Sequence, residues 1–463
     1  MNIRKYFGDK AFYKYVLGLS VPIMIQNFIT NFVSMLDNLM VGNLGTAQMS
    51  GVSVSNQLLF VFQLTVFGLV SGAGIFGAQY AGNKDVQGLR NTFKFKIIAS
   101  LIFTFCFCWV YAVANEALIG LYLKGDGDPT LAVETVKNAK AYLIIMLVGL
   151  YPTAVSQAYA SSLREVGQTK VPMYASLAAV VFNVVFDYIL IYGKFGAPRL
   201  EVRGAAIATV LARFLELAIL IIWSNRNKAK DLYAFIQGAW KPSKIPLELV
   251  KNIIIKGTPL MLNEALWSAG ITRLAQCYSM RDLNVVPAMS ISTTYFNLFS
   301  VLFVSMGVAI GIIIGQKLGA NDTDDIMLVT WRLILFSLIM SLICAILFIL
   351  CSLFIPNLYA TTREVRHMAT IFMIISASGM LGDSVCNSTY FTIRSGGNTL
   401  ITFLMDSGFV WCVCVATATI LINFTTLSVY LIYFIIQLCN YLKAAIGFTL
   451  VKKGIWINNI IQE

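Results

Sequence analysis

Twelve long apolar stretches, separated by short polar segments, leave this chain very few ways to fold. Of its 463 residues, 58% are hydrophobic and only 12% are charged. Soluble domains carry about 25% charged residues, and a soluble core could not hide so much apolar surface. We therefore expect an all-α polytopic membrane protein, with helices at approximately 14–43, 47–81, 91–115, 136–163, 171–193, 204–223, 252–280, 286–317, 329–356, 367–393, 399–423 and 426–451.

The two halves of the chain repeat one another. The segment GIFGAQYAGNKD at 74–85 returns as GIIIGQKLGAND at 311–322, and the same offset of 237 carries Pro22 onto Pro259. Six apolar stretches lie on each side of the polar segment 224–256. Both halves therefore enter the membrane from the same side, and a pseudo-two-fold axis along the membrane normal should relate them. This is the usual plan of a secondary transporter, with the substrate site between the halves.

The repeat divides the chain into three expected parts. A six-helix lobe covers 1–223, a cytoplasmic linker covers 224–251, and a second six-helix lobe covers 252–463. The linker is basic and should lie on the inner membrane surface as a short amphipathic segment. A flexible tether is the open alternative. Pro22 and Pro259 lie inside apolar stretches and should bend their helices, which makes them candidate hinges.

Orientation follows from the basic residues. The segments on the side of the N-terminus hold 22 Lys and Arg, and the segments on the other side hold 9. This bias predicts that both termini are cytoplasmic. No cleavable signal segment is evident, so we expect a multi-pass protein of the plasma (inner) membrane, surrounded by lipid and monomeric.

Several classes of protein are not expected. The net charge of +12 comes from basic residues in short loops, which argues against nucleic-acid binding. The nine Cys lie in or beside apolar stretches and are interpreted as core thiols, not as metal ligands or disulfides. The sequence contains no phosphate loop, zinc spacing or nucleophile elbow, so neither an enzyme nor a bound cofactor is expected.

Five acids interrupt the apolar stretches, and each costs about 2.5–3.5 kcal/mol at the bilayer centre if unpaired. Three residues of the first half, Asp37, Asp187 and Thr209, lie roughly 8–9 Å from the outer end of their helices. Asn183 shares a helix face with Asp187 because it is four residues earlier. Such a set of oxygen atoms suits sodium, and two close carboxylates also share a proton readily.

The second half has its own acids. Glu264, Asp383 and Asp406 lie roughly 12–17 Å from the inner boundary. They are candidates for a second cation or proton site, for the attraction of a cationic substrate, or for an internal counterion set around Arg273 or Lys443. Arg213 and Glu216, spaced i, i+3, are interpreted as a structural ion pair. The repeated glycines should allow close helix approach, and Gln79 and Gln316 are candidate hydrogen-bonding residues at the inner ends.

The chain resembles the MATE family of multidrug and toxic-compound extrusion proteins. The resemblance is carried by Pro22 with SMLDNLMVG at 34–42, NVVFD at 183–187, GAAIAT at 204–209, NEALWS at 263–268, and the repeated glycine–Gln segments. It implies two six-helix lobes around a central cleft and sodium- or proton-driven export of cationic or amphipathic compounds.

The resemblance also implies roles for single residues. In one branch of the family the first lobe couples transport to the ion, which corresponds here to Asp37, Asn183, Asp187 and Thr209, with Pro22 associated with bending of the first helix. In another branch the acids matching Glu264 and Asp383 are implicated. Some members of that branch place Tyr one turn before the latter acid, where this chain has Gly379.

These observations favour a cation-coupled antiporter that works by alternating access. The coupling ion, sodium or a proton, is assigned to the first lobe, and Glu264, Asp383 and Asp406 to a substrate-facing or auxiliary cation role. The alternative is a flippase for a lipid-linked substrate, which should line its cleft with basic residues for pyrophosphate. The chain offers mainly Arg213, Arg273 and Lys443 for that purpose within the apolar stretches, against five acids.

Overall fold

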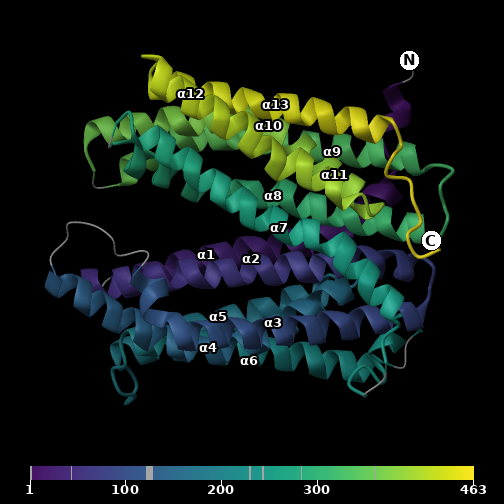
Figure 1. Cartoon of the computed structure of the whole chain (residues 1–463), viewed down its shortest axis with the longest axis horizontal. Coiled ribbons are helices and arrows are strands. Elements are labelled where there is room, and N and C mark those ends of the chain that lie inside the picture. The colour runs from purple at the N-terminus through teal and green to yellow at the C-terminus, as the bar shows by residue number, and fades with distance from the viewer. Residues whose placement is uncertain are drawn as a thin grey trace. The chain divides into compact units, whose positions relative to one another are not determined.

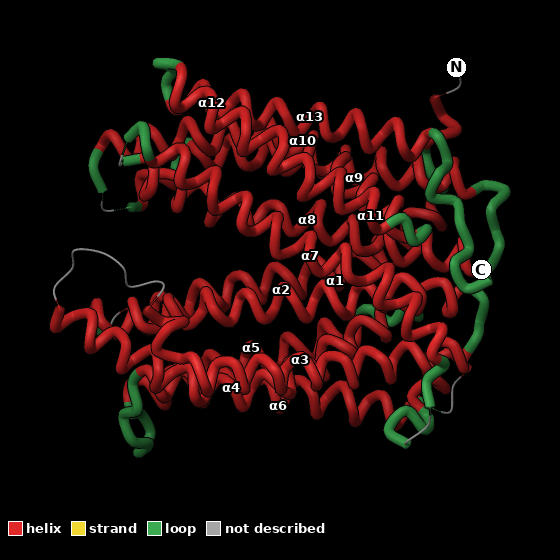
Figure 2. The backbone as a smooth tube through the Cα atoms, in the orientation of Figure 1, coloured by secondary structure: helices red, strands yellow, loops and turns green. Residues whose placement is uncertain are grey.

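The fold is that of a computed structural model, which describes residues 3–42, 44–120, 129–228, 231–241, 244–282, 284–359 and 361–462. Over these ranges the chain is built from helices joined by short loops, and no strand occurs (Figure 2). The long helices are α1 (Lys10–Gly42), α2 (Thr46–Gly82), α3 (Val86–Gly120), α4 (Pro129–Glu165), α5 (Lys170–Tyr192), α6 (Val202–Asn227), α7 (Leu247–Ser279), α8 (Val285–Gly319), α9 (Ile326–Ser352), α10 (Arg363–Ser395) and α13 (Val429–Lys452).

A twelfth long helix is wound unevenly. It starts as α11 (Thr399–Phe403), continues through the π-helical segments η4 (Leu404–Gly408) and η5 (Val410–Val415), and ends as α12 (Ala416–Phe424). Short 3₁₀ segments complete the inventory: η1 (Ile3–Tyr6), η2 (Asp231–Ile236) and η3 (Ile355–Leu358). The twelve predicted helices are therefore confirmed, although α7 begins five residues earlier than expected, inside the predicted linker.

Eleven of the twelve helices in the described ranges are long and apolar enough to cross a membrane. The exception is α7, which carries Asn263, Glu264 and Arg273 in its central part. These polar residues lower its hydropathy although its 33 residues are more than long enough to span the bilayer. Of the three, Asn263 is buried against neighbouring helices, whereas Arg273 is exposed.

Contacts divide the chain into two compact units. The leading unit comprises Ile25–Gly77 and Asp85–Asn252, and the trailing unit comprises Met1–Met24, Ala78–Lys84 and Ile253–Glu463. The first part of α1 and the last turn of α2 thus belong to the trailing unit. One boundary falls two residues after Pro22. Both Pro22 and Pro259 lie inside helices that continue through them, and the hinge role of each stays a prediction.

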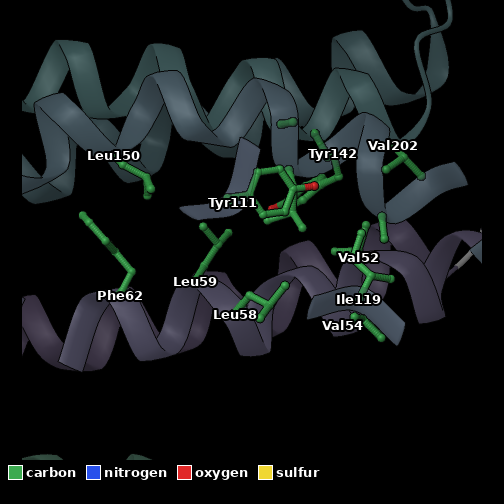
Figure 3. Close-up of a cluster of buried hydrophobic side chains, with 14 of the residues drawn as sticks. Val52, Val54, Leu58, Leu59, Phe62, Tyr111, Ile119, Tyr142, Leu150 and Val202 are labelled. Carbon is green, nitrogen blue, oxygen red and sulfur yellow. The ribbon is translucent and has the colours of Figure 1, made fainter. Parts of the chain in front are cut away.

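In the leading unit, α6 packs against α4 and α5, and α4 packs against α3 (Figure 1). The apolar core lies between these helices and α2. Figure 3 shows Leu59 and Phe62 of α2 pointing toward Tyr111, Tyr142 and Leu150 of α3 and α4. Because these side chains interdigitate, the core fixes the rotation of each helix about its own axis, which decides where the polar residues face.

The described part of the linker packs on the leading unit. The ring of Phe235, in η2, lies 5.4 Å from the ring of Phe93 on α3. The indole nitrogen of Trp240 donates to the hydroxyl of Tyr159 at 2.9 Å, and Arg90 donates to the carbonyl of Ala234 at 3.1 Å. Residues 231–241 therefore pack against α3 and α4 of the leading unit.

The repeated glycines serve two purposes. At the end of α2, a Cβ on Gly82 would stand 1.9 Å from the carbonyl oxygen of Gln316, and one on Gly319 would stand 1.9 Å from that of Gln79. This reciprocal approach of α2 and α8 confirms the expected close packing. Gly77 instead leaves room for a buried ion pair, because its Cβ would lie 1.9 Å from Oε2 of Glu165. That carboxylate accepts from the fully buried Lys96 at 2.5 Å.

In the trailing unit, α10 packs against α8, α9 and α13. The last turn of α2 joins it through the side chain of Gln79, which donates to the carbonyls of Ser395 and Asn458 and accepts from the amide of Ile460. The hydroxyl of Tyr15 donates to Oε1 of Gln316 at 3.1 Å. The two repeated glutamines thus anchor neighbouring segments of this unit.

Candidate functional site

The first-lobe residues predicted from depth lie together in the leading unit. Asp37 of α1 and Asp187 of α5 have their carboxyl groups within hydrogen-bonding reach of each other. Asn183 also lies on α5, and Thr209 lies on α6. The amide of Asn183 donates to the hydroxyl of Thr209 at 3.3 Å, which joins the two helices at the site. Asn183 also lies next to the carboxyl of Asp187, one helical turn away. Three helices therefore contribute two carboxylates, an amide and a hydroxyl to one site.

Three of the four carboxylate oxygens of this pair lack a hydrogen-bond donor among the described residues. Oδ1 of Asp37 and both carboxylate oxygens of Asp187 are buried and accept no hydrogen bond from the part of the chain that the structure describes. Asp187 is only 1% exposed. A buried polar group without a partner costs about 1–3 kcal/mol, and more when it is charged. A proton or a small cation bound between the two carboxylates removes this cost.

The apolar core closes one end of the site. Val41, Ile191 and Ala205 are core residues, each one helical turn from Asp37, Asp187 and Thr209 in the direction of Gly42, Tyr192 and Val202. At the same end, the hydroxyl of Tyr192 donates to the carbonyl of Met40 at 3.1 Å and ties α5 to α1. Apolar core residues and a bond between α1 and α5 therefore lie next to the carboxylate pair at this end.

Two further residues belong to the site that the sequence did not single out for it. Arg213 interacts electrostatically with Asp37 and forms the predicted ion pair with Glu216, whose closest atoms are 3.0 Å apart. Its position four residues after Thr209 was an available signal, because the two share a helix face. Tyr142 of α4 is buried in the core and interacts electrostatically with both carboxylates. Nothing in the sequence distinguishes it among 20 tyrosines.

The second-lobe acids lie in the trailing unit, and one of them is fully paired. Asp406 of η4 forms an ion pair with Lys443 of α13 through Oδ1. Its Oδ2 accepts from the amide of Asn263 of α7 at 2.8 Å. Both side chains of the ion pair are largely buried, with 12% of Lys443 and 18% of Asp406 exposed. The counterion interpretation is thereby confirmed for Lys443, while Arg273 donates to Gln276 at 3.2 Å.

The other two acids belong to the same polar network. Oδ1 of Asp383 of α10 accepts from the amide of Asn440 of α13 at 3.1 Å, and Asp383 also interacts electrostatically with Lys443. Glu264 of α7 interacts electrostatically with Arg394 and with Asp406. The structure thus brings the three predicted acids into one network with two basic residues of the chain. Their role toward a substrate or an auxiliary cation stays a prediction.

The uneven winding of the twelfth helix falls on this network. Asp406 and Ser407 lie in the π-helical η4, where Ser407 donates from its hydroxyl to Oδ1 of Asn263 at 2.7 Å. Short π-helical insertions frequently occur at functional sites. Here the wider turn directs two consecutive residues toward α7, since Ser407 bonds the same side chain that donates to Asp406.

The described residues offer no set of ligands for a transition metal. Within the described ranges, no group of three or more His, Cys, Asp or Glu side chains is arranged to hold a metal ion. The four leading-unit residues form a different kind of set, with two carboxylates and two neutral oxygen groups. Sodium accepts such ligands, because hard cations prefer oxygen atoms of any charge.

Comparisons with known proteins agree on a family. A family profile described as MatE matches residues 22–189 and 259–408. The chain is 22% identical over 416 residues to "Probable multidrug resistance protein NorM" of Thermotoga maritima, covering 90% of this chain and 87% of that protein. It is 25% identical over 410 residues to "Probable multidrug resistance protein YoeA" of Bacillus subtilis, covering 88% and 87% respectively.

A solved structure shares the fold. It is described as the outward-facing conformation of a multidrug resistance MATE family transporter of the MOP superfamily. It superposes with a TM-score of 0.85 at 20% identity and covers 97% of each chain. The predicted all-α polytopic membrane fold with two lobes is therefore confirmed.

Proposed function

The chain belongs to the MatE family, whose members are transporters and not enzymes, and we propose that it is a cation-coupled antiporter. It exports cationic or amphipathic small molecules by alternating access, driven by sodium or protons. The single observation that carries this proposal is the Asp37–Asp187 pair. Its buried oxygens accept no hydrogen bond within the described ranges, so they call for a positive ion.

The coupling ion binds at the leading-unit site. Asp37 and Asp187 supply the negative charge, and the side-chain oxygens of Asn183 and Thr209 are the neutral ligands available to sodium. A proton requires only the two carboxylates, because close like charges favour sharing one. Either ion neutralises the pair and changes the relative free energies of the two access states, which is the condition for coupling.

Substrate export follows from competition with the ion. Release of the ion leaves a buried negative pair, which raises the free energy of that state until a cationic substrate binds or the ion returns. Pro22 removes one backbone hydrogen bond from α1 fifteen residues before Asp37, so α1 is the helix that bends when the site changes its charge. Pro259 holds the corresponding position in α7.

The relatives support a broad substrate class. The relatives from Thermotoga maritima and Bacillus subtilis both carry multidrug resistance in their names, and a multidrug exporter needs an adaptable apolar site with few fixed polar contacts. Glu264, Asp383 and Asp406 give the trailing-unit network three carboxylates against two basic side chains, and this excess of acid favours cationic over anionic cargo. The same carboxylates disfavour the pyrophosphate of a lipid-linked substrate.

Orientation and assembly complete the proposal. The chain lies in the plasma membrane with both termini in the cytoplasm, as the excess of Lys and Arg on one side favours. It works as a monomer, because each half supplies its own polar network. Reaction of single engineered cysteines near Asp9 and Asp322 with an impermeant reagent tests the orientation: protection in intact cells is expected, and labelling contradicts it.

Proteoliposomes test the transport activity. Purified protein is reconstituted, a sodium or proton gradient is imposed, and export of a cationic dye is followed. We expect gradient-driven export by the natural chain and by Asp322→Asn, an exposed carboxylate outside the site. Asp37→Asn and Asp187→Asn should each abolish it. Full gradient-driven export by both variants overturns the assignment, and translocation of a labelled lipid without dye export favours the flippase.

A further inference from the structure

Both carboxylate oxygens of Asp406 are occupied by groups of the chain itself. The ammonium of Lys443 binds Oδ1, and the amide of Asn263 donates to Oδ2 at 2.8 Å. This differs from Asp187, whose two oxygens are buried and accept no hydrogen bond from any described residue. An acid that faces a bound ammonium needs no ion from solution.

Lys443 lies too far from the end of α13 for its ammonium to reach the membrane surface. It lies nine residues before the end of α13 at Lys452, roughly 13 Å along the helix axis. A lysine side chain is too short to bring its ammonium to that end, so it does not escape to the membrane surface as lysines near helix ends do. Its side chain is 12% exposed and directed at Asp406.

One face of α13 delivers the other donors. Gln437, Asn440 and Lys443 are spaced three residues apart, which aligns them along the helix. The amide of Asn440 donates both to Oδ1 of Asp383 and to Oε1 of Gln437, each at 3.1 Å. Lys443 interacts electrostatically with Asp383 as well as with Asp406. A single ammonium therefore serves two carboxylates from two different elements.

The third acid interacts with a different basic residue. Glu264 interacts electrostatically with Arg394, whose guanidinium also lies 5.3 Å from the ring of Phe391. The trailing-unit network thus contains three carboxylates and two basic side chains, all held within one compact unit. A cation from solution meets a site in which the chain already supplies positive charge.

We propose that Lys443 is a tethered cation, a side-chain ammonium that occupies the position a small monovalent cation would take between Asp406 and Asp383. It excludes external ions from the position between Asp406 and Asp383, and with Arg394 it leaves the three carboxylates of this network with one negative charge in excess. If Lys443 excludes external ions, ion coupling is confined to the leading unit, and only this consequence of the proposal rests on the proposed function. Whether the Lys443 ammonium occupies the cation position is tested by cation binding to the purified protein, without a transport assay.

Chemical rescue tests the tethered cation. Lys443→Ala removes the ammonium and leaves space, and Lys443→Gln retains an amide donor in case the alanine variant fails to fold. Both are made in the Asp187→Asn background, so that the leading-unit pair does not contribute. Thermal unfolding of purified protein is measured in sodium chloride, ammonium chloride and ethylammonium chloride, each against choline chloride at the same ionic strength.

We expect small cations to raise the unfolding temperature of the Lys443 variants but not that of their parent. In choline the single Lys443 variants should unfold at lower temperature than their parent, and sodium, ammonium or ethylammonium should restore the temperature with a saturable dependence. The parent should show no saturable response. The matched variant Lys443→Ala with Asp406→Asn should show little response, because it removes the ammonium and its principal carboxylate together.

Three results overturn the proposal. The first is an equal cation response in the Asp187→Asn parent and in the Lys443 variants. The second is an undiminished response when Asp406→Asn is added. The third result concerns folding. If neither single Lys443 variant yields folded protein, we expect the double variant to fold, because it removes both charges of the pair. A double variant that also fails to fold contradicts the proposal. Saturable stabilisation by sodium in the natural chain but not in Asp187→Asn tests the proposed function separately.

Discussion

Asp187 in the leading unit and Asp406 in the trailing unit are both buried carboxylates, yet the chain treats them differently. Asp406 receives the ammonium of Lys443 and the amide of Asn263. Asp187 lies beside a second carboxylate, and its oxygens accept no hydrogen bond from the described part of the chain. A satisfied acid stabilises one arrangement of helices, whereas an unsatisfied acid makes stability depend on what binds it. From this difference we predict that the stability and transport activity of the leading unit depend on a bound ion and that those of the trailing unit do not.

The largest expected effect comes from breaking the satisfied pair. Lys443→Met leaves Asp406 buried without its counterion, and removal of one partner of a buried ion pair costs about 3–5 kcal/mol. We expect a loss of that size in the free energy of unfolding, measured by denaturant titration in detergent micelles. Addition of Asp406→Asn should recover most of it. A variant as stable as the natural chain shows that the pair contributes nothing and removes the contrast.

Neutralising the unsatisfied acid should have the opposite sign. Asp187→Asn replaces a buried carboxylate that lacks donors, so in the absence of a coupling ion we expect the protein to gain about 1–3 kcal/mol of stability. The gain is read from melting curves in choline chloride, with Asp322→Asn as the exposed control. Destabilisation by Asp187→Asn, comparable to that of Lys443→Met, makes the two carboxylates equivalent and contradicts the account.

Thr209 distinguishes the two candidate ions. Thr209→Val removes a neutral oxygen and the acceptor of the Asn183 amide but leaves both carboxylates unchanged. If sodium is the coupling ion, its apparent affinity should fall by about tenfold, the equivalent of roughly 1.4 kcal/mol. If the ion is a proton, the pH dependence of export should stay as in the natural chain. The measurement is initial dye export over a series of sodium concentrations and pH values.

The smallest expected effect is at Arg213. Its side chain is 31% exposed, and its guanidinium pairs with Glu216 and interacts electrostatically with Asp37. Arg213→Gln removes a positive charge that competes with the coupling ion for Asp37. Because the group is partly exposed, we expect a change of only about 0.2–1 kcal/mol, seen as tighter ion binding in the concentration series. Weaker binding shows instead that Arg213 positions Asp37 for the ion.

The helices, and the depth of the polar residues along them, could be predicted from the sequence. Hydropathy and length gave twelve helices, and the rise per residue placed Asp37, Asp187 and Thr209 at one depth. The structure brings these residues together with Asn183, although their role in coupling stays untested. Depth is accessible because it follows from counting residues along a regular helix.

Rotation about the helix axis was not accessible in the same way. Lys443 and Arg273 were equivalent candidates for the second-lobe acids, and only packing shows that α13 turns Lys443 toward Asp406. The π-helical winding at Asp406 shifts the register of the residues that follow, which a count based on 3.6 residues per turn does not anticipate. Tyr142 was equally hidden, since its neighbourhood depends on the packing of α4 against the leading-unit core.

The most direct test compares the coupling of leading-unit and trailing-unit variants in proteoliposomes. The measured quantity is the ratio of dye export with an imposed sodium or proton gradient to export without one, for Asp187→Asn and for Glu264→Gln with Asp383→Asn. If ion coupling is confined to the leading unit, we expect a ratio near one for Asp187→Asn and a ratio well above one for the trailing-unit variant. A gradient-independent trailing-unit variant, together with an Asp187→Asn protein that still responds to the gradient, contradicts it.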